Sequence, residues 1–213
     1  MARFGTVIFD CDSTLSAVEG IDELAGGDAA VRALTAGAMR GEVPLEEVYG
    51  RRLELVRPSR ERVQTLGRHY VERMVPGSRE TLHALARAGV LVRVVSGGLR
   101  PAVLVLTREL LLPDDDVAAV ELDFTADGAY AGFDATSPLA RSNGKAAVIQ
   151  GWLPQLRGPV LMVGDGVTDL EARPPADAFA AFTGVVARAA VVAGADFVTE
   201  DMAAVRALVL GPE

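Results

Sequence analysis

The sequence predicts an α/β fold, in which a parallel sheet carries helices on both faces and a small helical domain is inserted after the first strand. Strands and helices alternate over most of the chain, and one all-helical stretch near the N-terminus interrupts that alternation. Alternating strands and helices favour parallel pairing with crossover helices. The 213 residues suit one domain with a smaller insertion. We therefore expect a core domain of residues 1–15 and 76–213 and a helical cap domain of residues 16–75.

The first strand is predicted at residues 6–9, a β-branched and aromatic run that ends at Asp10. From residue 18 to about residue 70, apolar residues recur at helical spacing and no clear strand is present. Turn-forming residues interrupt this stretch at Gly26-Gly27, at 41–44 and at 57–59. The stretch therefore predicts three or four helices.

The alternation resumes after the insertion. Pro76-Gly77-Ser78 opens a helix that Gly89 ends. Further strands are predicted at residues 90–95, 118–125, 129–133, 159–163, 178–182 and 195–198, with a hairpin turn joining the second and third of these. Helices are predicted at residues 101–112 and 145–156 and between and after the last strands.

Composition excludes several classes of function. The formal net charge is −8, which argues against a general nucleic-acid or anionic-membrane surface and requires local groups to capture any anionic ligand. The only cysteine, Cys11, excludes an internal disulfide and suits a reducing compartment. The sequence shows no signal peptide and no apolar run of ~18–20 residues that would span a bilayer. We therefore expect a cytoplasmic protein, and the sequence leaves open whether it is a monomer or a homodimer.

The basic residues are 20 arginines and one lysine, Lys145. One interpretation is a codon bias that converts lysine to arginine and leaves a single lysine by chance. Lysine differs from arginine where a compact point charge is needed instead of a planar fork.

Polar clusters stand at three predicted strand ends. They are Asp10 to Thr14, Ser96-Gly97-Gly98 and Gly164 to Asp169, and Lys145 begins a helix. Ligands bind at the carboxyl ends of the strands of an open parallel sheet, so these groups are expected to meet at one edge. Crowded carboxylates need a hard cation such as Mg²⁺, and a lysine, a serine and glycine N–H groups can hold a phosphate. A carboxylate there can attack phosphorus while a second one transfers protons.

These motifs, in this order, resemble the haloacid dehalogenase superfamily of phosphatases, which has a Rossmann-like core. The resemblance rests on Asp10-x-Asp12-x-Thr14, Ser96, Lys145 and Gly164-Asp165-Gly166-x-x-Asp169. Further segments, such as Glu19 to Ala25, are similar to the L-phosphoserine phosphatases of that superfamily, and the similarity covers nearly the whole chain.

The resemblance implies hydrolysis of O-phospho-L-serine, the last step of L-serine synthesis, through an aspartyl phosphate. It implies that Asp10 is the nucleophile and that Asp12 is the acid/base. It implies that Mg²⁺ is held by Asp10, by the backbone carbonyl of Asp12 and by Asp165, with Asp169 supporting them. The remaining implied substrate-binding residues are Ser96, Gly97, Gly98 and Lys145 for the phosphoryl group, Glu19 for the ammonium, Arg52 for the carboxylate, Met39 as a shield, and Thr168.

Two positions depart from the family pattern, Arg40 and Val120, and both bear on how strictly the amino acid is recognised. An alternative interpretation is that Glu19 and Arg52 are solvated surface charges on helices. Arg188 fits a surface role as well as a place in the site.

Two other functions compete with the hydrolase. A related phosphotransferase would pass the phosphoryl group to another hydroxy amino acid such as homoserine, and a related phosphatase would act on a different small phosphomonoester. A catalytically idle binding protein is a third class, against which the intact Asp10, Asp12, Lys145 and Asp165 argue.

Overall fold

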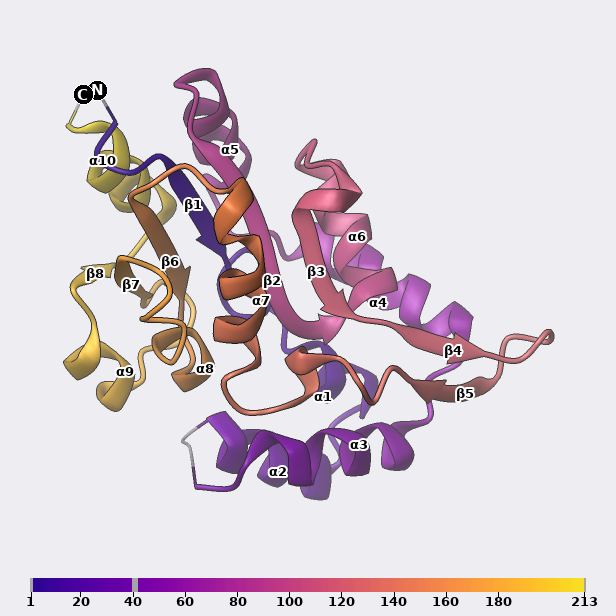
Figure 1. Cartoon of the computed structure of the whole chain (residues 1–213). Helices are drawn as coiled ribbons and strands as arrows, with labels where there is room; N and C mark the ends of the chain where they lie inside the picture. The colour runs from indigo at the N-terminus through magenta and orange to yellow at the C-terminus, as the bar shows by residue number, and fades with distance from the viewer. Residues whose placement is uncertain (1, 40–41, 213) are drawn as a thin grey trace.

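The protein is an α/β molecule built on six parallel strands (Figure 1). The computed structural model describes residues 2–39 and 42–212. The strand order is β3-β2-β1-β6-β7-β8, and every pair in this sheet is parallel. The strands are β1 (Thr6–Phe9), β2 (Leu91–Leu99), β3 (Val117–Val120), β6 (Val160–Gly164), β7 (Ala178–Phe182) and β8 (Phe197–Thr199). The predicted fold class is confirmed.

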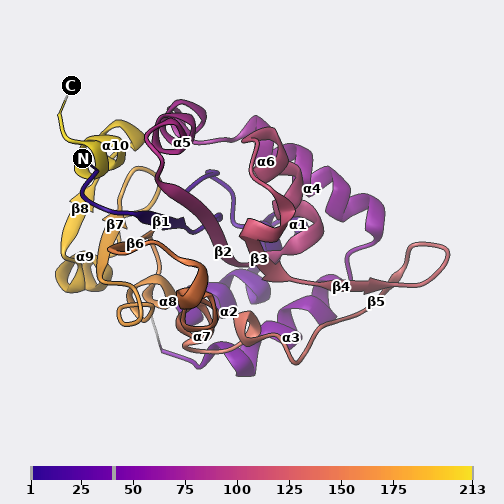
Figure 2. The same ribbon diagram turned by 45° about the horizontal axis from the view of Figure 1, so that its top comes forward.

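The central strands are apolar because both faces of the sheet are covered. Every residue of β1, β6 and β7 is buried, as expected for a parallel sheet between two helical layers. One layer contains α5 (Ser78–Arg87), α6 (Arg100–Glu109) and α10 (Met202–Leu210), and the other contains α7 (Gly144–Trp152), α8 (Val167–Leu170) and α9 (Ala189–Gly194) (Figure 2).

The inserted stretch forms four helices in the described part of the chain, in agreement with the predicted three or four. They are α1 (Gly20–Leu24), α2 (Ala29–Met39), α3 (Leu45–Val56) and α4 (Arg60–Glu72). Gly26 and Gly27, at φ values of 60° and 91°, make the turn after α1, a backbone conformation that glycine adopts without strain. None of the described helices is long and apolar enough to cross a membrane.

The helices of the insertion take two different positions. α2 and α3 lie beyond the carboxyl ends of the strands, whereas α4 lies along α6 of the core (Figure 1). The α4–α6 contact is close, because a Cβ at Gly67 would lie 2.6 Å from a methyl carbon of Val105.

A two-stranded antiparallel hairpin projects beside the insertion (Figure 1). It consists of β4 (Leu122–Phe124) and β5 (Tyr130–Phe133). The single strand predicted at residues 118–125 is therefore wrong: the chain leaves the main sheet at Glu121 and starts a second sheet. The hairpin packs on α3, where the rings of Phe133 and Tyr49 lie 5.4 Å apart between centroids.

Candidate active site

The polar residues singled out in the sequence gather where the strand order reverses. β1 lies between β2 and β6. The chain adds β2 and β3 on one side of β1 and later adds β6, β7 and β8 on the other, and such a reversal opens a crevice at the carboxyl ends of the strands. Asp10 directly follows β1 and Asp165 directly follows β6. The Asp10 N–H donates to the Val163 carbonyl oxygen at 2.9 Å, which holds the two strand ends together.

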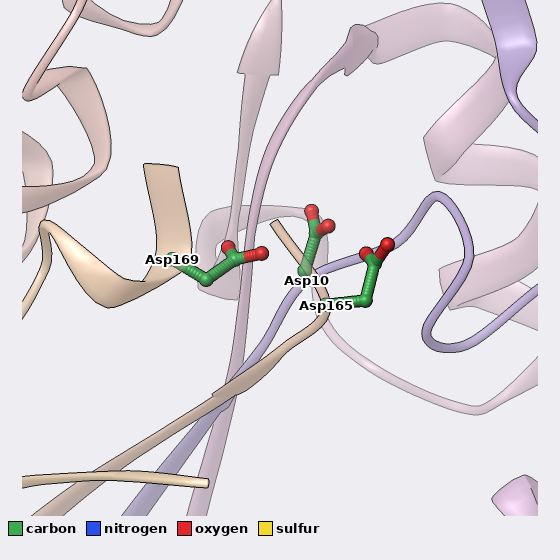
Figure 3. A group of neighbouring side chains, drawn as sticks. All are labelled: Asp10, Asp165 and Asp169. Carbon is green, nitrogen blue, oxygen red and sulfur yellow. The ribbon is translucent and has the colours of Figure 1, made fainter. Parts of the chain in front are cut away.

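Three buried aspartates and the only lysine form the floor of this crevice. Carboxylate oxygens of Asp10, Asp165 and Asp169 lie within 4.8 Å of one another, and Asp10 lies between the other two in Figure 3. Lys145 Nζ is 2.7 Å from Asp10 Oδ1 and 2.5 Å from Asp169 Oδ1. Burial by itself lowers the pKa of Lys145, but these two carboxylates outweigh it and raise that pKa above its usual value. Lys145 is therefore a permanent cation here.

The aspartate cluster fits a metal ion. Asp165 Oδ2 is buried and accepts no hydrogen bond from the residues that the structure describes, although the Arg188 guanidinium forms an ion pair with it. Both oxygens of Asp169 are in use, because Oδ1 accepts from Lys145 and Oδ2 accepts from the Gly166 N–H at 2.9 Å. An all-oxygen donor set with excess negative charge suits a hard divalent cation. Asp10 and Asp165 thus offer carboxylate oxygens to such a cation from between Lys145 and Arg188, and Asp169 orients the lysine and the Gly166 turn.

Asp12 does not join this cluster through its side chain. Its Oδ1 accepts a hydrogen bond from the Tyr70 hydroxyl at 2.6 Å, and its Oδ2 accepts one from the Gly20 N–H at 2.8 Å. Burial, followed by the charges of Glu19 and Asp10, raises the pKa of Asp12 to about 7 despite these bonds. The side chain therefore exchanges a proton near neutral pH.

The Ser96-Gly97-Gly98 segment belongs to the end of β2 and is not a loop after it. β2 continues to Leu99, beyond the predicted end at residue 95. Ser96 is fully buried, and its Oγ accepts from the Gly98 N–H at 2.9 Å. A Cβ at Gly98 would lie 3.2 Å from Asp12 Oδ1, so a larger residue there would crowd the Asp12 carboxylate.

Glu19 and Arg52 are in the site and not on the outer surface. Glu19 Oε1 accepts from the Ser13 hydroxyl at 2.7 Å and forms an ion pair with Arg188 at 3.4 Å, and burial raises the pKa of Glu19. Arg52 is 5% exposed, and its Nη1 donates to Thr35 Oγ1 at 3.0 Å. Within residues 2–39 and 42–212 no carboxylate forms an ion pair with Arg52, and its Nε is buried without a hydrogen-bond partner. This arginine is a buried cation available to an anion.

One pocket collects nearly all the predicted substrate-binding residues. Its lining includes Asp10, Asp12, Glu19, Arg52, Ser96, Gly97, Gly98, Lys145 and Thr168. Asp165 lies beside the pocket in the aspartate cluster. Met39 ends α2, but its side chain and all of Arg40 lie outside the described residues. Val120 is buried in β3, where it pairs with Leu99.

Several groups in and beside the pocket were not predicted. Tyr49, whose hydroxyl donates to the Gly97 carbonyl oxygen at 2.8 Å, lines it. Tyr70 contacts Asp12 from outside the lining. For Arg188 the sequence left open a surface role and a place in the site. It forms ion pairs with Asp165 and Glu19 and thus lies at the site. The other lining residues that the sequence did not single out are Ile21, Asp22, Thr35, Leu139 and Arg141.

Known proteins resemble this chain in sequence. A family model described as haloacid dehalogenase-like hydrolase matches residues 7–172. A phosphoserine phosphatase from Bos taurus is 43% identical over 199 residues, which cover 92% of this chain and 88% of that protein. A phosphoserine phosphatase from Homo sapiens is 44% identical over 186 residues, which cover 85% and 83% of the two chains.

Solved structures resemble it in fold. A substrate-bound phosphoserine phosphatase superimposes with a TM-score of 0.79 and 26% identity, and the match covers 94% of each chain. A phospho-aspartyl intermediate analogue of phosphoserine phosphatase gives a TM-score of 0.76 and 28% identity, over 92% of this chain and 93% of that one.

Proposed function

Since the chain belongs to the haloacid dehalogenase-like hydrolase family, we propose that it converts O-phospho-L-serine to L-serine and phosphate. The observation that carries this proposal is the set of charges in one pocket. The Asp10–Lys145 pair lies there with Glu19 and with Arg52, a buried arginine that no described carboxylate neutralises. The identity of 43–44% with two phosphoserine phosphatases supports the same substrate.

The three charged groups of O-phospho-L-serine each have a partner in the pocket. Arg52 offers a planar guanidinium to the carboxylate, and Glu19 offers a carboxylate to the ammonium. Lys145, the Ser96 hydroxyl and the Gly97 backbone hold the phosphoryl group. A substrate that lacks the ammonium and carboxylate groups makes no charged contact with Glu19 or Arg52, and it therefore binds less tightly.

Residues 16–75 act in this proposal as a cap over a core of residues 1–15 and 76–213. The position of α2 and α3 beyond the strand ends supports this division, as does the bond from Tyr49 in α3 to Gly97 in β2. Glu19 and Arg52 come from the cap, while the phosphoryl-binding groups come from the core. A cap that closes over the pocket excludes bulk water from the reaction.

The proposed metal is Mg²⁺, held by Asp10, Asp165 and the backbone carbonyl of Asp12. When bound, the ion neutralises charge between the attacking carboxylate and the phosphoryl oxygens. Asp169 acts behind these ligands, since its two oxygens hold Lys145 and the Gly166 N–H.

In the first step, an oxygen of Asp10 forms a bond to phosphorus while the bond from phosphorus to the serine oxygen breaks. Asp12 gives its proton to the serine oxygen, so serine leaves with a neutral hydroxyl group and Asp10 carries the phosphoryl group. In the second step, Asp12 takes a proton from water as the water oxygen attacks phosphorus, which releases phosphate and restores Asp10. A pKa of about 7 suits Asp12 to both transfers.

The test is phosphate release across a panel of substrates, with Mg²⁺ and with EDTA. The panel contains L-phosphoserine, D-phosphoserine, L-phosphothreonine, a phosphosugar and p-nitrophenyl phosphate. We expect a clear preference for L-phosphoserine that is lost with EDTA and in Asp10→Asn. Turnover of p-nitrophenyl phosphate without that preference would keep the phosphatase and reject the amino-acid substrate.

The same assay separates the hydrolase from a phosphotransferase. Phosphate release from L-phosphoserine alone supports hydrolysis. Release that requires added homoserine, with formation of phosphohomoserine, would instead identify a transferase. Failure to trap Asp10 with beryllium fluoride would reject both.

A further inference from the structure

Three polar side chains from three different helices form a connected chain inside the cap. The Thr35 hydroxyl on α2 donates to Asp22 Oδ1 on α1 at 2.5 Å. Thr35 Oγ1 in turn accepts a hydrogen bond from Arg52 Nη1 on α3 at 3.0 Å. Thr35 and Arg52 are both 5% exposed, and all three residues line the pocket.

The Thr35 hydroxyl has one proton and two lone pairs, so its partners fix its orientation. The proton can go to Asp22 or to the Val31 carbonyl oxygen, which lies 3.2 Å away in the same helix. The bond to the carboxylate is shorter and charge-assisted, and it therefore takes the proton. A lone pair of the hydroxyl then faces Arg52 Nη1.

This contact leaves one defined edge of the Arg52 guanidinium open. Nη1 is taken by Thr35, whereas neither Nε nor Nη2 donates a hydrogen bond to any residue in the described part of the chain. Nε and Nη2 lie on the same side of the planar group and form the fork that binds a carboxylate with two parallel bonds. The Tyr49 ring packs beside the guanidinium, with 5.4 Å from Arg52 Cζ to the ring centroid.

We propose that Thr35, backed by Asp22, is a positioning residue that fixes the Arg52 guanidinium so that its Nε–Nη2 edge faces the carboxylate of the substrate. This inference rests on the proposed function, because it assigns Arg52 to a substrate carboxylate. Arginine has many side-chain rotamers, and ordering them before binding removes an entropic cost that binding would otherwise carry. Thr35 therefore determines specificity for the amino-acid part of the substrate and leaves the phosphoryl chemistry alone.

The test compares O-phospho-L-serine with O-phosphoethanolamine, which lacks only the carboxylate. We expect Thr35→Val to raise KM for O-phospho-L-serine about tenfold, equivalent to ~1.4 kcal/mol, with kcat nearly unchanged. The kcat/KM for O-phosphoethanolamine is expected to stay within about twofold of wild type, because that substrate does not use Arg52. Thr35→Ser, which keeps the hydroxyl, should restore the KM for O-phospho-L-serine.

Thr107→Val is the matched control. Thr107 is fully buried in α6, and among the described residues its hydroxyl bonds only to the Leu104 carbonyl oxygen. Loss of this hydroxyl should therefore leave the ratio of kcat/KM for the two substrates unchanged. If Thr35→Val does not fold by circular dichroism, Thr35→Ala removes the same hydroxyl with less bulk and carries the same expectation.

Three outcomes would overturn the positioning role. If Thr35→Val lowered kcat/KM equally for both substrates, Thr35 would be a merely structural residue. If it lowered kcat/KM for neither, Thr35 would have no role in the site. A wild-type enzyme that does not prefer O-phospho-L-serine to O-phosphoethanolamine would reject the proposed substrate and this inference with it. The ratio of kcat/KM for the two substrates, measured with the wild-type enzyme alone, distinguishes failure of the proposed function from failure of the positioning role.

Discussion

Asp12 is held by two hydrogen bonds, yet its surroundings oppose its charge. The Tyr70 hydroxyl and the Gly20 N–H stabilise the carboxylate, while burial and the neighbouring Glu19 and Asp10 destabilise it. The second set of effects prevails and raises the pKa to about 7. A group poised in this way is suited to proton transfer at the expense of stability, a balance often seen at active sites.

Replacement of Asp12 by Asn should separate activity from stability. In the metal-free protein the ionised form of Asp12 is unfavourable, because its pKa is raised from 3.8 to about 7 on folding. Wild-type stability should therefore fall as pH rises from about 4 through about 7, whereas Asp12→Asn avoids this loss. We expect kcat to fall by about 10²–10⁴ and the EDTA-treated variant to be more stable than wild type at pH 8, by up to about 4 kcal/mol.

Urea unfolding at pH 5 and pH 8 measures this effect. The increase in the free energy of unfolding caused by Asp12→Asn should be larger at pH 8 than at pH 5. A variant less stable than wild type at pH 8 would show that the fold accommodates the Asp12 charge after all.

Regular elements were predictable from the chain because their signals are local. β7 has the predicted bounds, residues 178–182, and the glycine and proline breaks separate the four helices of the insertion as expected. The break at Glu121 carried no turn residue, so the strand at residues 118–125 seemed continuous.

The polar groups that support the site escaped prediction for a different reason. Tyr70 lies 58 residues from Asp12, Tyr49 lies 48 residues from Gly97, and Thr35 lies 17 residues from Arg52. A single tyrosine or threonine in a helix has no motif, and only folding brings it to its partner. The motif residues were predictable because strand ends of a parallel sheet meet at one edge.

The α4–α6 contact reverses the usual effect of a helical glycine. Gly67→Ala would normally stabilise a helix by up to about 1 kcal/mol, but its new Cβ would lie 2.6 Å from a Val105 methyl carbon. We expect Gly67→Ala to lower the free energy of unfolding by about 1–3 kcal/mol through overpacking. Gly151→Ala in α7, whose Cβ meets nothing within 4 Å, should raise it by about 0.5–1 kcal/mol. If thermal or denaturant unfolding showed that both variants change the free energy of unfolding in the same direction, this account would be contradicted.

The bond from α3 to β2 can be tested with two tyrosines. Tyr49→Phe keeps the ring on Phe133 but removes the donor to the Gly97 carbonyl oxygen, and we expect a loss of about 1 kcal/mol in stability. Tyr130→Phe removes a buried hydroxyl that has no hydrogen-bond partner in the described part of the chain, so stability should be unchanged or higher. Denaturant unfolding measures both, and an equal loss in the two variants would argue against a specific stabilising bond between α3 and β2.

At the scale of the whole molecule, a chain with a net charge of −8 concentrates three aspartates at one point. Lys145 and Arg188 neutralise only part of this charge. A divalent cation that binds there relieves repulsion in the folded state and has no equivalent site in the unfolded chain. Metal binding should therefore stabilise the whole fold.

Thermal unfolding with and without Mg²⁺ measures this coupling. At a Mg²⁺ concentration about 100 times Kd we expect a stabilisation of ~2.7 kcal/mol, which corresponds to a rise in Tm of about 5–10 °C for a chain of this size. Asp165→Asn should lose most of the rise, while Asp115→Asn, which removes an exposed charge, should retain it. A rise of equal size in both variants would place the metal elsewhere.

Lys145 gives this protein an unusual spectroscopic property. The chain contains one lysine, and its ammonium lies between Asp10 and Asp169. Protein expressed with isotope-labelled lysine would therefore give a single set of side-chain NMR signals, all from the reaction centre. These signals would report metal binding, the proposed phosphorylation of Asp10 and product release without any resonance assignment.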